Sequence, residues 1–455
     1  MEPFEKDINM ARELAQAVQK AGGVAYFVGG CVRDRLRGAP TKDLDVEIHG
    51  LAPAKLEEIL DSLGRRIAVG ESFGIYGLKG YSLDIAMPRK EENRGKGHRD
   101  FEVFVDPFIG TRKAAERRDF TVNALMEDVL SGRIVDEFNG RRDLEQGILR
   151  HVNDQTFAED PLRVLRGAQF AARFGFCLAP ETAEIFKKMS LESLPRERIM
   201  GELEKALLKA ERPSVFFEIL RETGQLDLWF PELKALIGVE QNPKHHPEGD
   251  VWIHSMMVLD QAARHRKKAK NPLGLMLAAL THDFGKAICT ERSNGELHSY
   301  SHETLGLPLI RSFMRRLTHE TGLTRYVLNL AELHMKPNVL AAAQASLKST
   351  NKMFDQAVDP EGLLWLAAAD QTEENPAYAA FLWERLKVFE AYMSRPYVMG
   401  KDLIEAGLKP CPEFTEYLQF AHKLRLAGVE KEEALKQTLG HARAIKRKQE
   451  NPNDI

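Results

Sequence analysis

The sequence is short of cysteine and of long apolar runs, and each absence excludes a class of protein. Its four cysteines are scattered over 455 residues and form no Cys-x-x-Cys pair, which argues against a disulfide framework and a cysteine zinc site. No apolar run approaches the roughly 18 residues of a membrane-spanning helix, and the acidic N-terminus lacks the apolar stretch of a secretory signal. We therefore expect a protein of the reducing cytoplasm that has no membrane partner.

An excess of one charge is also absent. The 64 basic and 67 acidic residues leave a net charge of −3, so the whole chain lacks the basic composition typical of nucleic-acid-binding proteins. Basic residues nevertheless cluster in segments 89–99, 112–118, 264–270 and 442–448. Such clusters are usually solvated surface, and they bind phosphate only where a site lies beside them.

The pattern of apolar residues changes near residue 150. Before that point, short runs such as VAYFV and DLDVEIH predict strands between helical segments. Beyond it, almost every segment shows the 3.6-residue period of a helix. The sequence predicts an α+β fold with a small mixed α/β head followed by all-α regions, in domains over residues 1–150, 151–237, 238–345 and 346–455.

A glycine pair and two aspartates form the first candidate site. The pair that ends at Gly30 lies at a predicted strand-to-helix junction, where backbone N–H groups and Arg33 can bind phosphate. Asp43 and Asp45 are two apart on the next predicted strand, so both carboxylates face the same side. Paired carboxylates suit Mg²⁺, and two such ions activate a hydroxyl and stabilise a leaving pyrophosphate. Asp84, on a neighbouring predicted strand, is a candidate third carboxylate.

The segment EDPLR forms the second candidate site. It places Asp160 and Arg163 three residues apart, on one face of a predicted helix. A carboxylate accepts from an exocyclic amine and a guanidinium donates to a ring nitrogen, which matches cytosine and adenine but not uracil and guanine. One pocket could therefore accept CTP and ATP and reject UTP and GTP. Taken alone, such a pair is more often a surface ion pair.

Histidines and aspartates in the order H…HD…H…H…D form the third candidate site. Imidazole and carboxylate ligands on successive helices fit a divalent transition metal such as Mn²⁺, Ni²⁺ or Fe²⁺, with a bound water as nucleophile. We expect the metal ligands to be His254, His282, Asp283 and Asp370, with His302 and His334 in the same series.

These motifs carry a resemblance to known families. The segment FVGGCVRDRLRGAPTKDLDVEIHG closely resembles the head signature of the class II tRNA nucleotidyltransferase/poly(A) polymerase family, within the DNA polymerase β superfamily. The match continues through ERRDFTVNAL, AEDPLRVLR and RERIMGELEKAL. The histidine series resembles the HD phosphohydrolase superfamily, and residues 399–419 resemble the C-terminal region of CCA enzymes that carry an HD domain, thought to hold the tRNA elbow.

The resemblance implies a role for each matching residue. The head would be polymerase-β-like, with Asp43 and Asp45 as catalytic residues that bind Mg²⁺. Arg117 or Arg118 would face the triphosphate, and Asp119 and Asn123 the ribose or the neighbouring structure. The expected nucleotide-binding set is Gly30, Arg33, Arg118, Asp119, Asn123, Asp160, Arg163 and Arg166.

Two further positions bear on this motif set. Arg198 and Glu202, in RERIMGELEKAL, would brace the nucleotide-selecting helix. Gln169 stands where the family commonly has arginine, which removes one possible phosphate or tRNA contact.

The implied activity is template-independent addition of CCA to tRNA 3′ ends from CTP and ATP, with release of pyrophosphate and an additional HD phosphatase or phosphodiesterase activity. Members of the family that add the terminal A resemble one another in having a charged loop at the place of residues 87–101, so the resemblance implies full CCA addition or A addition rather than CC addition. An A-adding enzyme that works with a separate CC-adding enzyme stays open, as does an HD phosphohydrolase whose head only docks RNA. A non-catalytic RNA-binding protein would not need both metal sets. The expected partners are tRNA, ATP and CTP, and the expected assembly is a monomer or homodimer.

Overall fold

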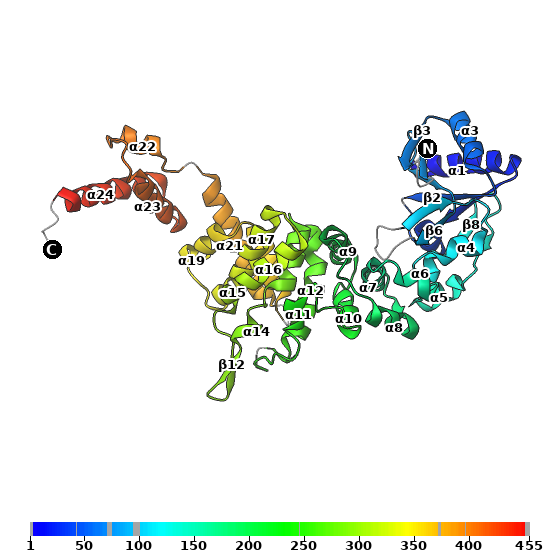
Figure 1. Ribbon diagram of the computed structural model, residues 1–455. Coiled ribbons are helices and arrows are strands. Elements are labelled where there is room, and N and C mark those ends of the chain that lie inside the picture. The colour runs from blue at the N-terminus through cyan, green and yellow to red at the C-terminus, as the bar shows by residue number, and fades with distance from the viewer. Residues whose placement is uncertain are drawn as a thin grey trace. The chain divides into compact units, whose positions relative to one another are not determined.

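The computed structural model describes residues 3–41, 43–70, 75–93, 101–244, 246–371, 375–395 and 397–450. The chain divides into two units: the first comprises Met1–Ala210 and Val215–Leu228, and the second Glu211–Ser214 and Trp229–Ile455. Each unit is described by itself below (Figure 1).

A seven-stranded sheet organises the first unit, in the order β3-β4-β5-β2-β1-β8-β9. Strands β2 and β5 pair in parallel, whereas the other neighbours in the sheet are antiparallel. The strands are β1 (Val24–Val28), β2 (Leu44–His49), β3 (Arg66–Gly70), β4 (Ile75–Leu78), β5 (Leu83–Ala86), β8 (Met126–Asp128) and β9 (Ile134–Val135). Outside this sheet, β6 (Arg89–Asn93) pairs with β7 (Phe101–Val105), and β10 (Ile148–Leu149) pairs in parallel with β11 (Cys177–Leu178).

The helices of the first unit bury their apolar sides on this sheet and on one another. In α1, residues at helical spacing such as Leu14 and Val18 are fully buried, and they join Leu56 and Leu60 of α3 and Val46 of β2 in one core. The helices of this unit are α1 (Pro3–Lys20), α2 (Gly30–Leu36), α3 (Pro53–Leu63), α4 (Thr111–Glu116), α5 (Gly140–Gln146), α6 (Asp154–Ala158), α7 (Leu162–Phe174), α8 (Pro180–Lys188), α9 (Arg196–Lys209) and α10 (Ser214–Glu222).

The described residues of the second unit form helices and one short hairpin, β12 (Glu291–Ser293) with β13 (Glu296–His298). Its central helix α13 is buried on all sides from Gly274 to Thr281, as its unbroken apolar run predicts. The helices are α11 (Pro231–Lys234), α12 (Val251–His265), α13 (Pro272–Thr281), α14 (Lys286–Cys289), α15 (His302–Leu305), α16 (Leu307–Leu317), α17 (Thr321–Leu333), α18 (Met335–Ala342), α19 (Leu347–Gln356), α20 (Pro360–Ala369), α21 (Pro376–Ser394), α22 (Gly400–Glu405), α23 (Phe414–Leu426) and α24 (Lys431–Glu450).

The mixed head followed by helices confirms the predicted fold class. Among the described residues, no helix combines the length and the apolar character needed to span a membrane.

Candidate functional site

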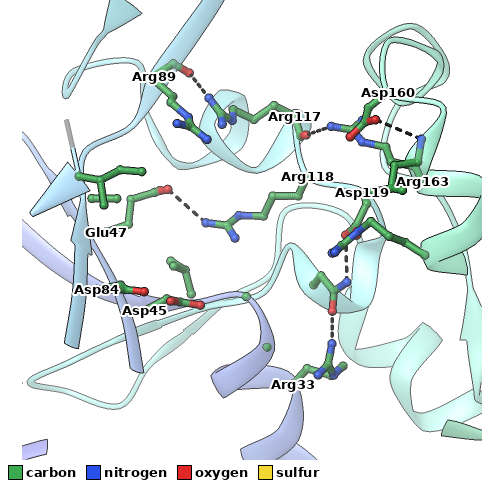
Figure 2. A pocket seen from close by; sticks show the side chains of 18 of the residues that line it. Arg33, Asp45, Glu47, Asp84, Arg89, Arg117, Arg118, Asp119, Asp160 and Arg163 are labelled. Atoms are coloured by element: carbon green, nitrogen blue, oxygen red, sulfur yellow. Dashed lines mark hydrogen bonds and ion pairs between the residues drawn. The ribbon is translucent and has the colours of Figure 1, made fainter. Parts of the chain in front are cut away.

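A cavity of ≈ 650 Å³ opens in the first unit where β2 and β5 face the segment that follows α4 and the start of α7 (Figure 2). Charged side chains dominate its lining. They are Arg33, Asp45, Glu47, Asp84, Arg89, Arg117, Arg118, Asp119, Asp160, Arg163, Arg166 and Arg198.

Two carboxylates lie side by side on the floor of this cavity. Asp45 of β2 is directly opposite Asp84 of β5 in the parallel register, so both project from the same face, as Figure 2 shows. Burial raises the pKa of the Asp45 carboxyl, the charges of Asp84 and Asp43 raise it further, and Arg118 opposes them. A divalent cation would remove this repulsion, and oxygen donors of this kind fit Mg²⁺.

Asp43 is placed differently from Asp45. It directly precedes β2, is exposed, and is not among the residues that line the cavity, although its charge acts on Asp45. The structure therefore pairs Asp45 with Asp84, whereas Asp43 lies just before the first residue of β2.

Glu47 holds Arg118 over the same floor. Its Oε2 lies 3.1 Å from Arg118 Nη2, and its Oε1 lies 2.9 Å from His49 Nε2. Although burial would raise it, these two partners lower the pKa of Glu47 to about 2. Sequence reasoning missed Glu47, whose signal is its place two residues after Asp45 on the same face of the strand.

A chain of hydrogen bonds positions two more arginines at the cavity wall. Arg33 Nη1 donates to Asn123 Oδ1 at 2.6 Å, and Asn123 Nδ2 donates to Asp119 Oδ1 at 2.9 Å. Arg166 donates to Asp119 Oδ2 through Nε at 2.8 Å and Nη2 at 2.6 Å. Burial would raise the pKa of Asp119, but Arg166 and Asn123 lower it, so the carboxylate stays charged. Asp119 and Asn123 thus contact neighbouring side chains of the unit and line the cavity.

Asp160 and Arg163 both line the cavity, but the expectation that they share one helix face is wrong. Helix α7 begins at Leu162, because the ring of Pro161 disfavours a helical conformation for the residue before it. The Asp160 carboxylate instead accepts from the Leu162 N–H at 3.1 Å, ahead of the helix. Arg163 donates to the backbone carbonyl of Arg117 through Nη2 at 2.7 Å.

The two residues expected to brace the nucleotide-selecting helix, Arg198 and Glu202, both lie on α9. Arg198 of α9 donates to Asp160 Oδ2 at 3.1 Å, and Glu202 is buried beside α7, where its charge raises the pKa of Arg166 after the larger contribution of Asp119. Gln169 is only 1% exposed, and its Nε2 has no hydrogen-bond partner among the described residues. Its side chain therefore lies inside the unit rather than on an RNA-facing surface.

The histidine series converges in the second unit. His254 lies on α12, His282 and Asp283 directly follow α13, and Asp370 ends α20. His254 Nε2 lies 3.0 Å and His282 Nε2 3.3 Å from Asp370 Oδ1. His302 joins them from α15, with Nε2 3.2 Å from Asp283 Oδ1.

Three of these imidazoles are fixed in one orientation. Nδ1 of His282, His302 and His334 donates to the backbone carbonyl three residues earlier, at 2.8, 2.8 and 2.6 Å. A carbonyl can only accept, so Nδ1 carries a proton in each ring and Nε2 is the ring nitrogen turned toward the centre.

The donor set at this centre fits a divalent metal. His282 Nε2 and both Asp283 oxygens are buried and make no hydrogen bond within the described residues, although Lys286 Nζ lies 2.7 Å from Asp283 Oδ2. Burial lowers the pKa of His282, but Asp283 and Asp370 outweigh it and raise it to about 10. Asp283 and Asp370 thus favour positive charge among these rings, which a metal cation would also supply, and mixed imidazole and carboxylate ligands suit a transition metal.

One supporting residue was not predicted. Glu248 Oε1 lies 2.7 Å from His254 Nδ1 and 3.0 Å from His246 Nδ1, so it orients His254 from behind. It lies in the turn-rich stretch before α12, where the sequence offers no periodic pattern.

Comparison with known proteins agrees with this arrangement. The chain matches the family models for the poly A polymerase head domain over residues 25–150, the probable RNA and SrmB-binding site of polymerase A over 175–237, and the HD domain over 251–375. A multifunctional CCA protein of Methylococcus capsulatus is 37% identical over 428 residues, which are 89% of this chain and 94% of that protein. The chain belongs to the multifunctional CCA protein family. A second member, from Nitrosococcus oceani, is 39% identical over 399 residues, 84% of this chain and 93% of that protein.

Solved structures share the fold of this family member. The Bacillus stearothermophilus CCA-adding enzyme in complex with CTP has a TM-score of 0.65 at 22% identity, covering 98% of this chain and 99% of that one. The Thermotoga maritima CCA-adding enzyme complexed with tRNA has a TM-score of 0.65 at 19% identity, covering 95% of each chain. These findings confirm the predicted resemblance, the polymerase-β-like head and the enzyme class, a nucleotidyltransferase with an HD domain.

Proposed function

We propose that the chain adds CCA to tRNA 3′ ends from CTP and ATP, with the reaction in the cavity of the first unit. The observation that carries this proposal is the pairing of Asp45 with Asp84 beneath a wall of arginines. The relatives are named multifunctional CCA proteins, and solved neighbours in the fold were captured with tRNA, ATP or CTP. The names of these relatives favour full CCA addition over the A-adding alternative.

Asp45, Asp84 and Asp43 would hold Mg²⁺. An ion held there would supply Lewis-acid chemistry, which favours ionisation of the attacking 3′-hydroxyl and neutralises charge on the leaving pyrophosphate. Arg118 is aimed at the floor by Glu47, and Arg33 is held by Asn123, so both can donate to the triphosphate without rearranging. The positive φ of 70° at Gly29 turns the chain so that the backbone of Gly30 approaches the phosphates.

Asp160 and Arg163 would select the base. Arg198 fixes the Asp160 carboxylate, and the carbonyls of Arg117 and Thr156 fix the Arg163 guanidinium. A carboxylate beside a guanidinium pairs with the amine and ring nitrogen of cytosine or adenine. Uracil and guanine present a carbonyl oxygen and a ring N–H at these positions, which face a carboxylate and a guanidinium with the wrong polarity, and this accounts for rejection.

The HD centre would hydrolyse a phosphoester with a divalent transition metal, Mn²⁺, Ni²⁺ or Fe²⁺, bound by His254, His282, Asp283 and Asp370. The bound metal supplies an activated water. Lys286 is poised at Asp283 to bind a phosphate oxygen.

The helical segment 346–455 would bind tRNA. The loop 87–101 would assist A addition, and its residues 94–100 lie outside the described residues.

Separating the two activities tests these assignments. Asp45→Asn should abolish incorporation of labelled CTP and ATP into a tRNA transcript while hydrolysis of a 2′,3′-cyclic nucleotide continues. His282→Ala should abolish hydrolysis of the cyclic nucleotide while incorporation of CTP and ATP continues. Transfer that survives in Asp45→Asn would overturn the proposed metal ligands, and loss of both activities in either variant would show that the two centres are not separate.

A further inference from the structure

Two arginines of the first unit, Arg37 and Arg173, share one aromatic ring. The Cζ atoms of Arg37 and Arg173 lie 4.4 Å and 5.0 Å from the ring centroid of Phe174. Within the part of the chain that the structure describes, neither guanidinium makes a hydrogen bond or an ion pair.

The carboxylate whose charge acts on both arginines, Asp34, is already paired with Arg33. Asp34 accepts from Arg33 Nε at 2.8 Å and from Arg33 Nη2 at 3.0 Å. Arg33 Cζ also lies 4.4 Å from the Phe174 centroid, so three guanidinium groups surround one ring with a single carboxylate. Burial lowers the pKa of Arg37 and of Arg173, the charge of Asp34 opposes this, and the charge of Arg33 lowers both further. Three guanidinium groups beside a single carboxylate leave an excess of positive charge, which attracts an anion.

The cluster continues the wall of the cavity. Arg33 and Phe170 line the cavity, whereas Arg37 follows Arg33 by one turn at the end of α2 and Phe174 follows Phe170 by one turn in α7. The rings of Phe170 and Phe174 stack with centroids 5.6 Å apart. An anion bound by Arg37 and Arg173 would therefore lie one helical turn, about 5.4 Å, beyond the residues proposed for the triphosphate.

We propose that Arg37 and Arg173, stacked on Phe174, bind a phosphodiester group of the acceptor strand of the RNA substrate. The proposal rests on the proposed function, which supplies that RNA. The planar guanidinium presents paired N–H donors that match phosphate oxygens, a geometry that lysine does not reproduce. Stacking on the ring holds both side chains in place before RNA binds, which reduces the entropy lost on binding.

The test uses the full chain and a tRNA transcript that ends at the discriminator base. In Arg37→Gln/Arg173→Gln, the KM for the transcript should rise about 10-fold while the KM for CTP is unchanged. The slope of log affinity against log salt, measured from binding of the labelled transcript without nucleotide, should become shallower by about 1. Removing like charges should not lower the melting temperature.

Arg35→Gln is the matched control. Arg35 lies on the same helix but pairs with Glu127 at 2.6 Å and stacks on Phe27, so its loss should change neither KM nor the salt slope. Arg37→Lys/Arg173→Lys should keep most of the salt slope but lose part of the affinity, because charge remains and the planar donors do not.

An unchanged KM and salt slope in the double glutamine variant would overturn the proposal. A rise in the KM for CTP alone would also overturn it, because it would assign the cluster to the triphosphate. If the unaltered chain extends no transcript, the proposed function fails instead, and transcript binding still decides whether the arginine cluster contacts RNA.

Discussion

The contribution of Asp84 to the head site can be measured through the Mg²⁺ requirement of nucleotide incorporation. It faces Asp45 across the parallel strands β2 and β5, and its charge raises the pKa of the Asp45 carboxyl after the larger effect of burial. Asp84→Asn should raise the Mg²⁺ concentration for half-maximal incorporation by about 10–100-fold, because a ligand or its close support is lost.

Asp84→Asn should also shift the pH dependence of the incorporation rate. A carboxyl with a raised pKa loses its charge, and with it the metal, as the pH falls through that pKa. Removing the Asp84 charge lowers the pKa of Asp45, so the acid limb of the incorporation rate should shift to lower pH. A limb that stays in place or moves to higher pH would contradict the close coupling of these two carboxylates.

Glu248 offers a matching test in the HD centre. Its Oε1 accepts from His254 Nδ1, which fixes the ring with Nε2 toward Asp370. Glu248→Gln should weaken binding of Mn²⁺ or Ni²⁺ about 10–100-fold in equilibrium dialysis, with CTP incorporation unchanged. Glu296→Gln, which removes an exposed carboxylate paired with Lys244, should leave metal binding as it is. Equal affinity in the Glu248 and Glu296 variants would contradict a positioning role for Glu248.

Among the helices, α7 carries Arg163 and Arg166 and packs against α9, which supplies Arg198. Gly167 lies at a tight contact in α7: a Cβ there would come within 2.5 Å of Phe186 and 2.9 Å of Phe120. Gly167→Ala should therefore destabilise the first unit by about 1–3 kcal/mol in denaturant unfolding.

Gly201→Ala in α9 is the control for this substitution. A Cβ at Gly201 would meet nothing within 4 Å, so the gain in helix propensity should stabilise by up to about 1 kcal/mol. Destabilisation by both variants, or by neither, would contradict the close packing at α7.

The pattern of apolar residues predicted many of the strands and helices, and the predictions that were wrong or incomplete have physical causes. Alternating runs predicted β1 and β2, and the apolar period predicted the helices, because both signals are local. The pairing of β2 with β5 joins residues far apart in the sequence, so Asp84 could be named only as a candidate. The three-residue spacing to Arg163 predicts that Asp160 lies on the same helix. This prediction fails because Pro161 disfavours a helical conformation for the residue before it.

At the scale of the whole molecule, one chain carries two chemically different centres in two units. The head cavity offers oxygen ligands for Mg²⁺ and arginines for phosphate, whereas the HD centre offers imidazole and carboxylate ligands for a transition metal. Family membership and fold support the assignment of nucleotide transfer to the first centre. The order of bases added depends both on the residues proposed to hold the metal and triphosphate and on the residues proposed to select the base.

The most direct measurement is nucleotide incorporation into three tRNA transcripts that end at the discriminator base, after one C, and after two. Each is offered CTP, ATP, UTP or GTP with Mg²⁺, and then CTP and ATP together. We predict growth of the first transcript by C, C and A, and no incorporation of UTP or GTP. Extension of the last transcript alone, by a single A, would contradict full CCA addition, and extension of none would contradict nucleotide transfer by this chain.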